Sequence, residues 1–110
     1  MICFITGASR GFGKAFAIEI ATVLKGPLKL VLCSRNNDKL VELRDELFAL
    51  RNPVDTVVEL IVSDLSDLNS IDGISQNFFN NRESAYTRHI FLNNAGSLGP
   101  LNTVTVLTIQ

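Results

Sequence analysis

Short, largely apolar runs alternate with segments of helical periodicity along this chain. The runs are four to seven residues long and are bounded by turn-forming residues, which is typical of buried strands in a parallel sheet. The third run is also rich in β-branched residues, which favour strands. We therefore expect strands over 2–6, 28–33, 56–62 and 89–92.

The segment 13–24 has the pattern of an amphipathic helix. Phe16, Ile20 and Val23 recur at positions i, i+4 and i+7, and we expect them to face the core. A Gly-Pro pair at 26–27 follows the pattern and should end the helix.

A second helix is expected before the Asn52-Pro53 pair, with Asn36 or Asn37 as its N-cap. Four leucines are spaced to share the buried face of this helix: Leu40, Leu43, Leu47 and Leu50. Charged residues fill the opposite, solvent-facing side: Glu42, Arg44, Asp45 and Glu46.

A third helix is expected after a cap at Ser66 or Asp67, although Gly73 weakens it by about 1 kcal/mol relative to alanine. Its inner face would be formed by three apolar residues, Ile71, Ile74 and Phe78. Strands that alternate with helices in this way predict right-handed βαβ crossovers. The expected fold is one α/β domain over 1–110, a Rossmann-like doubly wound parallel sheet truncated after about the fourth strand.

The last ten residues, 101–110, alternate apolar residues with threonine, which favours a strand over a helix. No charged residue occurs between Ile90 and Gln110, so we expect this segment to lie inside something larger or to be an abnormal tail. Three explanations of this tail stay open: a fragment, a splice form or an incomplete gene model.

Composition narrows the possible partners. The net charge is −1, which argues against a nucleic-acid surface, and no apolar run is long enough for a membrane helix. Cys3 and Cys33 lie in apolar runs, so we expect buried free thiols in a reducing cytosol. His89 is expected to be structural, and no metal site is expected.

The turn between the first strand and the first helix carries three glycines. Gly7 would permit a tight turn, Gly11 would let a phosphate approach the backbone, and Gly13 would let the helix pack closely. An ordinary glycine-rich turn without a ligand is the alternative. A nucleoside-triphosphate P-loop is disfavoured, because Ala8 and Ala15 replace its first glycine and its magnesium-binding hydroxyl residue.

The end of the second strand bears on which dinucleotide binds. NAD sites place a carboxylate there, but this chain has none until Asp38. Arg35 and Arg10 carry forked donors that suit a 2′-phosphate, which favours NADP(H) unless both are simply solvated. Asp64 either approaches the adenine ring or caps the following helix.

Three motifs together resemble those of the short-chain dehydrogenases/reductases. They are Thr6-Gly7-x-x-x-Gly11-x-Gly13, Asp64, and the Asn-Asn-Ala-Gly element that begins at Asn93. The resemblance implies an NADP(H)-dependent oxidoreductase. It also implies a set of cofactor-lining residues: Gly7, Ala8, Ser9, Arg10, Gly11, Phe12, Gly13, Arg35, Asn36, Asp64, Leu65, Asn93, Ala95 and Gly96.

Within the family, the likeness is closest to the pterin-reducing members, on the stretches 7–13, 34–36 and 93–99. The resemblance implies a cytosolic homodimer that reduces a small-molecule carbonyl, a pterin side chain, in tetrahydrobiopterin synthesis. The family's dimer helices would be largely missing from this chain.

The family's catalytic Tyr-x-x-x-Lys pair has no counterpart here. Tyr86 is the only tyrosine, residue 90 is isoleucine, and the last lysine is Lys39. We therefore assign no catalytic residue to this chain and expect Tyr86 to be a partly exposed loop residue. Two hypotheses follow: the cofactor-binding half of a reductase, inactive alone, or a non-catalytic product that binds NADP(H) or modulates a dimer.

Overall fold

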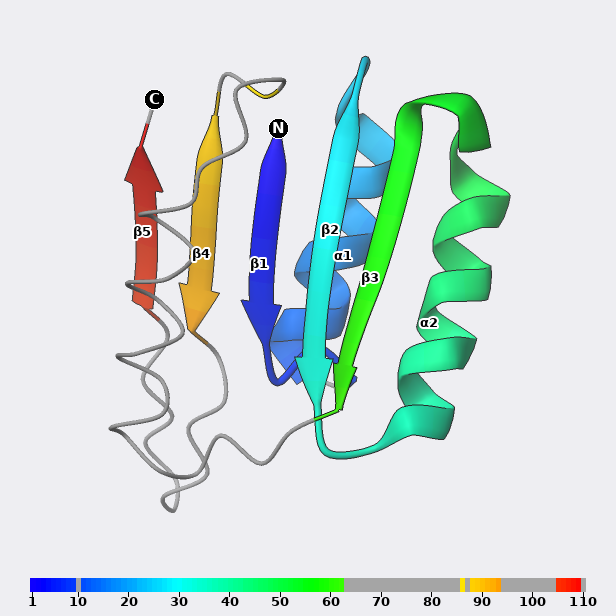
Figure 1. Cartoon of the computed structure of the whole chain (residues 1–110), viewed down its shortest axis with the longest axis vertical. Helices are drawn as coiled ribbons and strands as arrows, with labels where there is room; N and C mark the ends of the chain where they lie inside the picture. Colours follow the sequence, from blue (N-terminus) through cyan, green and yellow to red (C-terminus); the bar gives the residue numbers. More distant parts are fainter. Residues whose placement is uncertain (10, 63–85, 87, 94–104, 110) are drawn as a thin grey trace.

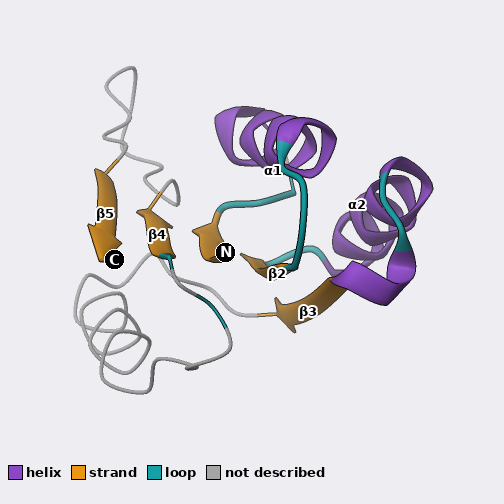
Figure 2. Ribbon diagram, turned by 90° about the horizontal axis from the view of Figure 1, so that it is seen from above, coloured by secondary structure: helices purple, strands orange, loops and turns teal. Residues whose placement is uncertain are grey.

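The computed structural model of the chain describes residues 1–9, 11–62, 86, 88–93 and 105–109. In these residues one five-stranded sheet carries two α-helices, which lie on the same face of it (Figures 1 and 2). The elements are β1 (Ile2–Thr6), α1 (Gly11–Val23), β2 (Leu28–Ser34), α2 (Asn37–Leu50), the short 3-10 turn η1 (Pro53–Asp55), β3 (Thr56–Val62), β4 (His89–Asn93) and β5 (Thr105–Ile109).

The strand order is β3-β2-β1-β4-β5. Strands β1 to β4 are mutually parallel, which confirms the predicted Rossmann-like sheet. The chain builds outward from β1 to β3 and then crosses to the other side of β1 to form β4. This reversal creates a topological switch point between β1 and β4, where open α/β sheets bind their ligands at the carboxyl ends of the strands.

Strand β5 adds an antiparallel partner to β4, and the two pair over their whole length, from His89 opposite Ile109 to Asn93 opposite Thr105. The threonine-alternating tail therefore forms a strand, as its pattern predicts. The fifth strand was not part of the predicted parallel sheet, because the pattern gives no pairing direction.

The core lies between the sheet and the two helices. Its strand residues alternate with those of the opposite face, as the pleat requires. The fully buried leucines of this core are Leu28, Leu30, Leu32, Leu40, Leu43, Leu47 and Leu92. On the opposite face, the rings of Phe4 and Phe91 stack with their centroids 5.0 Å apart.

The buried face of helix α1 differs from the predicted one. Its buried residues are Gly13, Ala17 and Ala21, whereas Val23 is 59% exposed. Phe16 and Ile20 are only partly buried at the edges of this small-residue stripe. The sheet approaches closely enough that small residues take the central line, and larger side chains are displaced to its flanks.

Helix α2 matches its predicted face at three of four leucines, since Leu50 is 46% exposed in the last turn. Its N-cap is Asn36, whose Oδ1 accepts a hydrogen bond of 3.1 Å from the backbone N–H of Lys39. This satisfies one of the otherwise unpaired amides of the first turn. The predicted third helix lies outside the described residues.

Candidate functional site

The glycine-rich turn joins the carboxyl end of β1 to the start of α1, beside the switch point (Figure 1). Gly7 and Gly11 both have φ of 62°, a left-handed conformation that residues with a Cβ rarely adopt. Two such residues within five positions let the chain leave the strand and enter the helix directly. A positive φ is the conformation that a tight turn at Gly7 requires; the approach of a phosphate to Gly11 stays a prediction.

Gly11 is the first residue of α1, and the space around it is open. A Cβ built on Gly11 would meet no atom within 4 Å, so the backbone there can be approached closely by another group. Gly13, by contrast, is buried against the core, in keeping with its predicted packing role.

The amino end of α1 suits an anion. The first turn contains no acidic side chain, and the first backbone N–H groups of a helix have no partner within it. The helix dipole adds a partial positive charge at the same place. Phe12 is 54% exposed in this turn, and its ring lies 6.2 Å from that of Phe16.

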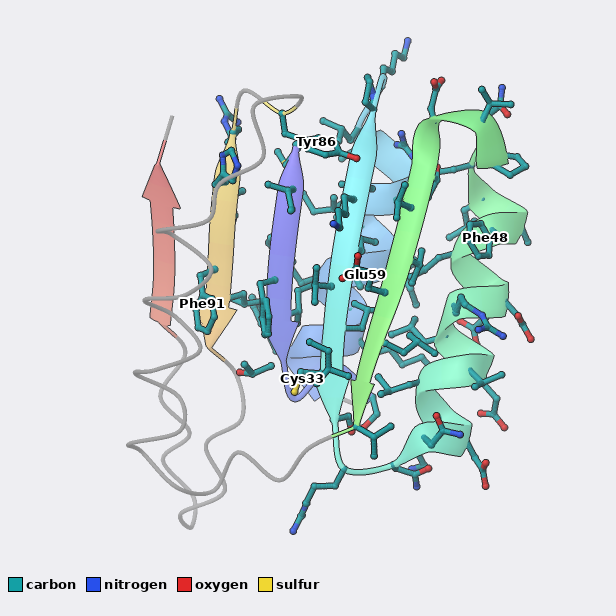
Figure 3. All side chains as sticks on the ribbon, viewed as in Figure 1. Cys33, Phe48, Glu59, Tyr86 and Phe91 are labelled. Carbon is teal, nitrogen blue, oxygen red and sulfur yellow. The ribbon has the colours of Figure 1, made fainter. Side chains whose placement is uncertain are left out.

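Two hydrogen bonds fix the turn to the neighbouring strands. The backbone N–H of Ala8, a fully buried residue, donates to the carbonyl of Cys33 in β2 over 3.1 Å. The hydroxyl of Thr6 donates to the carbonyl of Leu92 in β4 over 3.5 Å. The turn is thus anchored on both sides of β1, and Cys33 marks the carboxyl end of β2 beside it (Figure 3).

The β2–α2 turn lies against the glycine-rich turn. The hydroxyl of Ser34 donates to that of Ser9 over 2.7 Å and accepts from the backbone N–H of Asn36 over 3.3 Å. Arg35 stands between Ser34 and Asn36, and its side chain is exposed. The structure therefore places Ser9, Ser34 and Asn36 together beside the exposed Arg35, whereas Arg10, the other residue predicted for the 2′-phosphate, lies outside the described residues.

Asn93 ends β4 and so lies at the same edge of the sheet as the glycine-rich turn. The other predicted cofactor residues, Arg10, Asp64, Leu65, Ala95 and Gly96, lie outside the described residues.

The two thiols are free and buried, as predicted. Burial raises the pKa of Cys3 to about 12 and that of Cys33 to about 11. Both thiols are therefore protonated at neutral pH and are poor nucleophiles, although the carbonyl of Cys33 holds the glycine-rich turn.

Tyr86 lies at the opposite end of the sheet from the glycine-rich turn (Figure 3). The hydrogen bond from the Ile2 amide to the Arg88 carbonyl, 2.9 Å long, places this part of the chain at the amino end of β1. Tyr86 is half-buried outside regular structure and is remote from the cofactor turn, as its predicted loop role requires.

His89 is buried at the start of β4, consistent with its predicted structural role. Among the described residues, no group of histidine, cysteine, aspartate and glutamate could hold a metal ion. In the same residues, no helix is long and apolar enough to cross a membrane.

Sequence reasoning missed the contact between Ser9 and Ser34. Ser34 was noted only as part of the stretch that ends the second strand. Ser34 ends a buried strand two residues before the N-cap Asn36, where a serine can bond a nearby backbone amide, but its other partner, Ser9, is 25 positions away and is set by the fold.

Comparison with known proteins places these features in a family. The short-chain dehydrogenase family model matches residues 1–109. Sepiapterin reductase of Meriones unguiculatus is 34% identical over 105 residues, an alignment that covers 92% of this chain and 38% of that protein. An NADP-dependent 3-hydroxy acid dehydrogenase of Schizosaccharomyces pombe is 38% identical over 92 residues, covering 84% of this chain and 32% of that protein.

Solved structures agree on the fold. An NADPH-dependent reductase of bacilysin biosynthesis superposes with a TM-score of 0.54 at 30% identity, covering 72% of this chain and 29% of that one. A β-ketoacyl-[ACP] reductase of Bacteroides thetaiotaomicron has a TM-score of 0.59 at 24% identity, covering 86% and 40% respectively.

The chain thus spans well under half the length of the relatives it matches. Over that length, three observations point to the same family. They are the parallel sheet, the left-handed glycines at the switch point, and the match of the family model to residues 1–109. The chain belongs to the short-chain dehydrogenase family.

Proposed function

We propose that this chain forms the NADP(H)-binding part of an NADPH-dependent carbonyl reductase similar to sepiapterin reductase. The observation that carries the proposal is the open backbone of Gly11, in left-handed conformation at the amino end of α1. Such a helix end binds a pyrophosphate through its free N–H groups.

The residues of the turn would divide the work of holding the cofactor. Gly11 and the following amides of α1 would face the pyrophosphate, Gly7 would turn the chain beneath it, and Ala8 would hold the turn through Cys33. When bound, the cofactor supplies the hydride. The described residues supply its binding and orientation.

Arg35 is the residue we assign to the 2′-phosphate. Its guanidinium is exposed at the carboxyl end of β2, where NAD-specific proteins place a carboxylate instead. A planar guanidinium can pair with a phosphate through two N–H donors. We propose that Arg10, Asp64 and Leu65 complete this side of the site, the last two beside the adenine ring.

The substrate class rests on the relatives. The sepiapterin reductase of Meriones unguiculatus is 34% identical to this chain. An NADPH-dependent pterin aldehyde reductase of Arabidopsis thaliana is 30% identical over 94 residues. We propose a pterin side-chain carbonyl as the substrate of the whole protein, which would act as a cytosolic homodimer in tetrahydrobiopterin synthesis.

Carbonyl reduction also needs a proton donor, and the family's Tyr-x-x-x-Lys pair is absent from these 110 residues. A second candidate for the chain by itself is a non-catalytic product that binds NADP(H) or modulates a dimer. In both cases we expect no pterin reductase turnover by residues 1–110 alone.

Titration of the 110-residue chain with NADPH and with NADH tests the proposal. We expect NADPH to bind at least tenfold more tightly, and Arg35→Ala to remove most of that preference. Arg44→Ala is the matched control, because Arg44 lies on α2 beside Asp45, 3.7 Å away, and should leave both affinities unchanged. Equal binding of NADPH and NADH by the unsubstituted chain would refute the assignment.

A further inference from the structure

Strand β5 is joined to the rest of the sheet by its backbone pairing with β4. It is the last strand in the order β3-β2-β1-β4-β5, and it pairs with β4 from His89 to Asn93. The two described helices lie over β1, β2 and β3, and neither lies over β5 (Figures 1 and 2). A strand with one paired edge and no described helix over it belongs to the part of a fold that opens first.

Strand β4, in contrast, is held from its other side. It pairs in parallel with β1, and the Ile2 amide donates to the carbonyl of Arg88, just before β4, over 2.9 Å. At the other end, the hydroxyl of Thr6 donates to the carbonyl of Leu92 over 3.5 Å. When β5 opens, β4 therefore stays in place and presents a row of backbone donors and acceptors to another strand.

The edge of β4 that β5 covers, which we call the β4 edge, suits a second copy of this chain. Natural edge strands avoid association through charged residues or proline, and β4 contains neither. In a two-fold antiparallel pairing, β4 meets itself: Phe91 lies opposite its own equivalent, and His89 of one copy lies opposite Asn93 of the other. No pair of carboxylates or of lysine and arginine side chains is brought together, so like-charge repulsion does not oppose the contact.

We propose that β5 is a releasable strap over the β4 edge, and that its release lets two copies of this chain pair through β4. The closed chain is a monomer, whereas two open chains form a continuous sheet across the two-fold axis. The contact lies outside the glycine-rich turn. The inference therefore goes beyond the proposed function and does not rest on it.

A disulfide across the strap tests this proposal on the full 110-residue chain. Asn93 and Thr105 are partners in the β4–β5 register, and antiparallel partners have Cα separations that a disulfide can span. The variant Asn93→Cys/Thr105→Cys is oxidised at low protein concentration, where closure within one chain is favoured, and its reduced form is the matched control. Cys3 and Cys33 are buried and should stay reduced.

Sedimentation velocity over a wide range of protein concentration compares the oxidised form, the reduced form and the unsubstituted chain. We expect the last two to form dimers as the concentration rises, and the dimer dissociation constant of the oxidised form to be at least about tenfold higher. Equal self-association of the oxidised and reduced forms would place the contact elsewhere, for example on the outer edge of β5, and would overturn the proposal. An unsubstituted chain and a reduced form that both stay monomeric throughout would overturn it as well.

Hydrogen exchange of the unsubstituted chain gives a second measurement, which decides the point even where the disulfide does not close or the variant does not fold. The amides of β5 should exchange at least about tenfold faster than those of β1, because β5 opens without the rest of the sheet. Amides of β5 that are as well protected as those of β1 would show that β5 is a fixed strand and not a releasable strap.

Discussion

Gly11 and Gly26 share a backbone conformation but lie at opposite ends of the sheet. Their φ values are 62° and 94°, and a Cβ on either would meet no atom within 4 Å. Gly11 opens α1 at the carboxyl ends of the strands, whereas Gly26 lies between α1 and β2 at their amino ends. Substitutions at the two glycines therefore separate two effects: the stability lost when a side chain is placed at positive φ, and the loss of a binding surface.

We expect Gly11→Ala and Gly26→Ala each to lower the free energy of unfolding by about 1 kcal/mol, because alanine is strained at positive φ. Only Gly11→Ala should also weaken NADPH, by at least tenfold, since its methyl group would occupy the approach to the backbone. Urea unfolding and NADPH titration of both variants measure the two effects. A similar loss of NADPH affinity in Gly26→Ala would contradict the placement of the NADPH site at Gly11.

At the residue scale, glycine spacing was enough to predict which backbone positions would be special. Gly7 and Gly11 both adopt the left-handed conformation, because only glycine enters it without a steric penalty. The roles of Thr6 and Ser34 could not be predicted in this way. Their partners, the Leu92 carbonyl and the Ser9 hydroxyl, become neighbours only when the strands pair.

Helix α1 shows what periodicity leaves open at the element scale. The apolar residues at helical spacing predicted the helix, but the central line of contact is Gly13, Ala17 and Ala21. Small residues are apolar enough to be buried and let the helix axis approach the strands. A ranking by hydrophobicity alone expects Phe16 rather than Ala17 at the contact with the sheet. It therefore places the buried face of α1 part of a turn away from where it lies.

We expect Ala17→Leu to lower the free energy of unfolding by about 1–3 kcal/mol, because the added atoms have no room between α1 and the sheet. Ala15 lies on the exposed side of the same helix, so Ala15→Leu should change stability by less than about 0.5 kcal/mol. Denaturant unfolding of the two variants gives the comparison. Equal effects would mean that α1 buries a different face.

Arg51 joins three elements at the end of the sheet remote from the site. Its guanidinium donates to the backbone carbonyls of Leu24 and Gly26, which follow α1, and its Nε donates to the Thr56 hydroxyl over 2.9 Å at the start of β3. Arg51 itself directly follows Leu50, the last residue of α2. It therefore fixes the ends of both helices relative to β3.

Arg51→Ala should cost about 2 kcal/mol of unfolding free energy, because it removes charge-assisted bonds to partly buried acceptors. Arg44→Ala, on the solvent side of α2, should cost less than about 0.5 kcal/mol. Thermal and urea unfolding test the difference. The NADPH affinity of folded Arg51→Ala should stay unchanged, since the residue lies far from the glycine-rich turn.

At the scale of the whole molecule, β5 closes one edge of the sheet. It pairs with all five residues of β4, whose sequence includes the apolar run Ile90-Phe91-Leu92. An uncovered apolar edge offers unpaired backbone groups to other chains and promotes association. In a longer doubly wound sheet, the same edge would accept the next parallel strand.

Leu107→Pro, at the centre of β5, should break this pairing and increase self-association. Size-exclusion chromatography over a range of protein concentrations would detect a larger fraction of high-mass species. Leu107→Thr keeps a strand-forming residue and serves as the control. An elution profile of Leu107→Pro identical to that of the control would show that β5 does not protect the edge.

The sequence by itself predicted β1 to β4, α1 and α2, their order and the position of the glycine-rich turn, because apolar period, turn residues and glycine conformation are local properties. It also determined that the family's tyrosine and lysine pair is absent. The tertiary structure alone decided the strand order around β1, the antiparallel direction of β5, and the small-residue face of α1. It also decided that Ser9 meets Ser34. These depend on contacts between distant positions, which packing selects and local sequence does not encode.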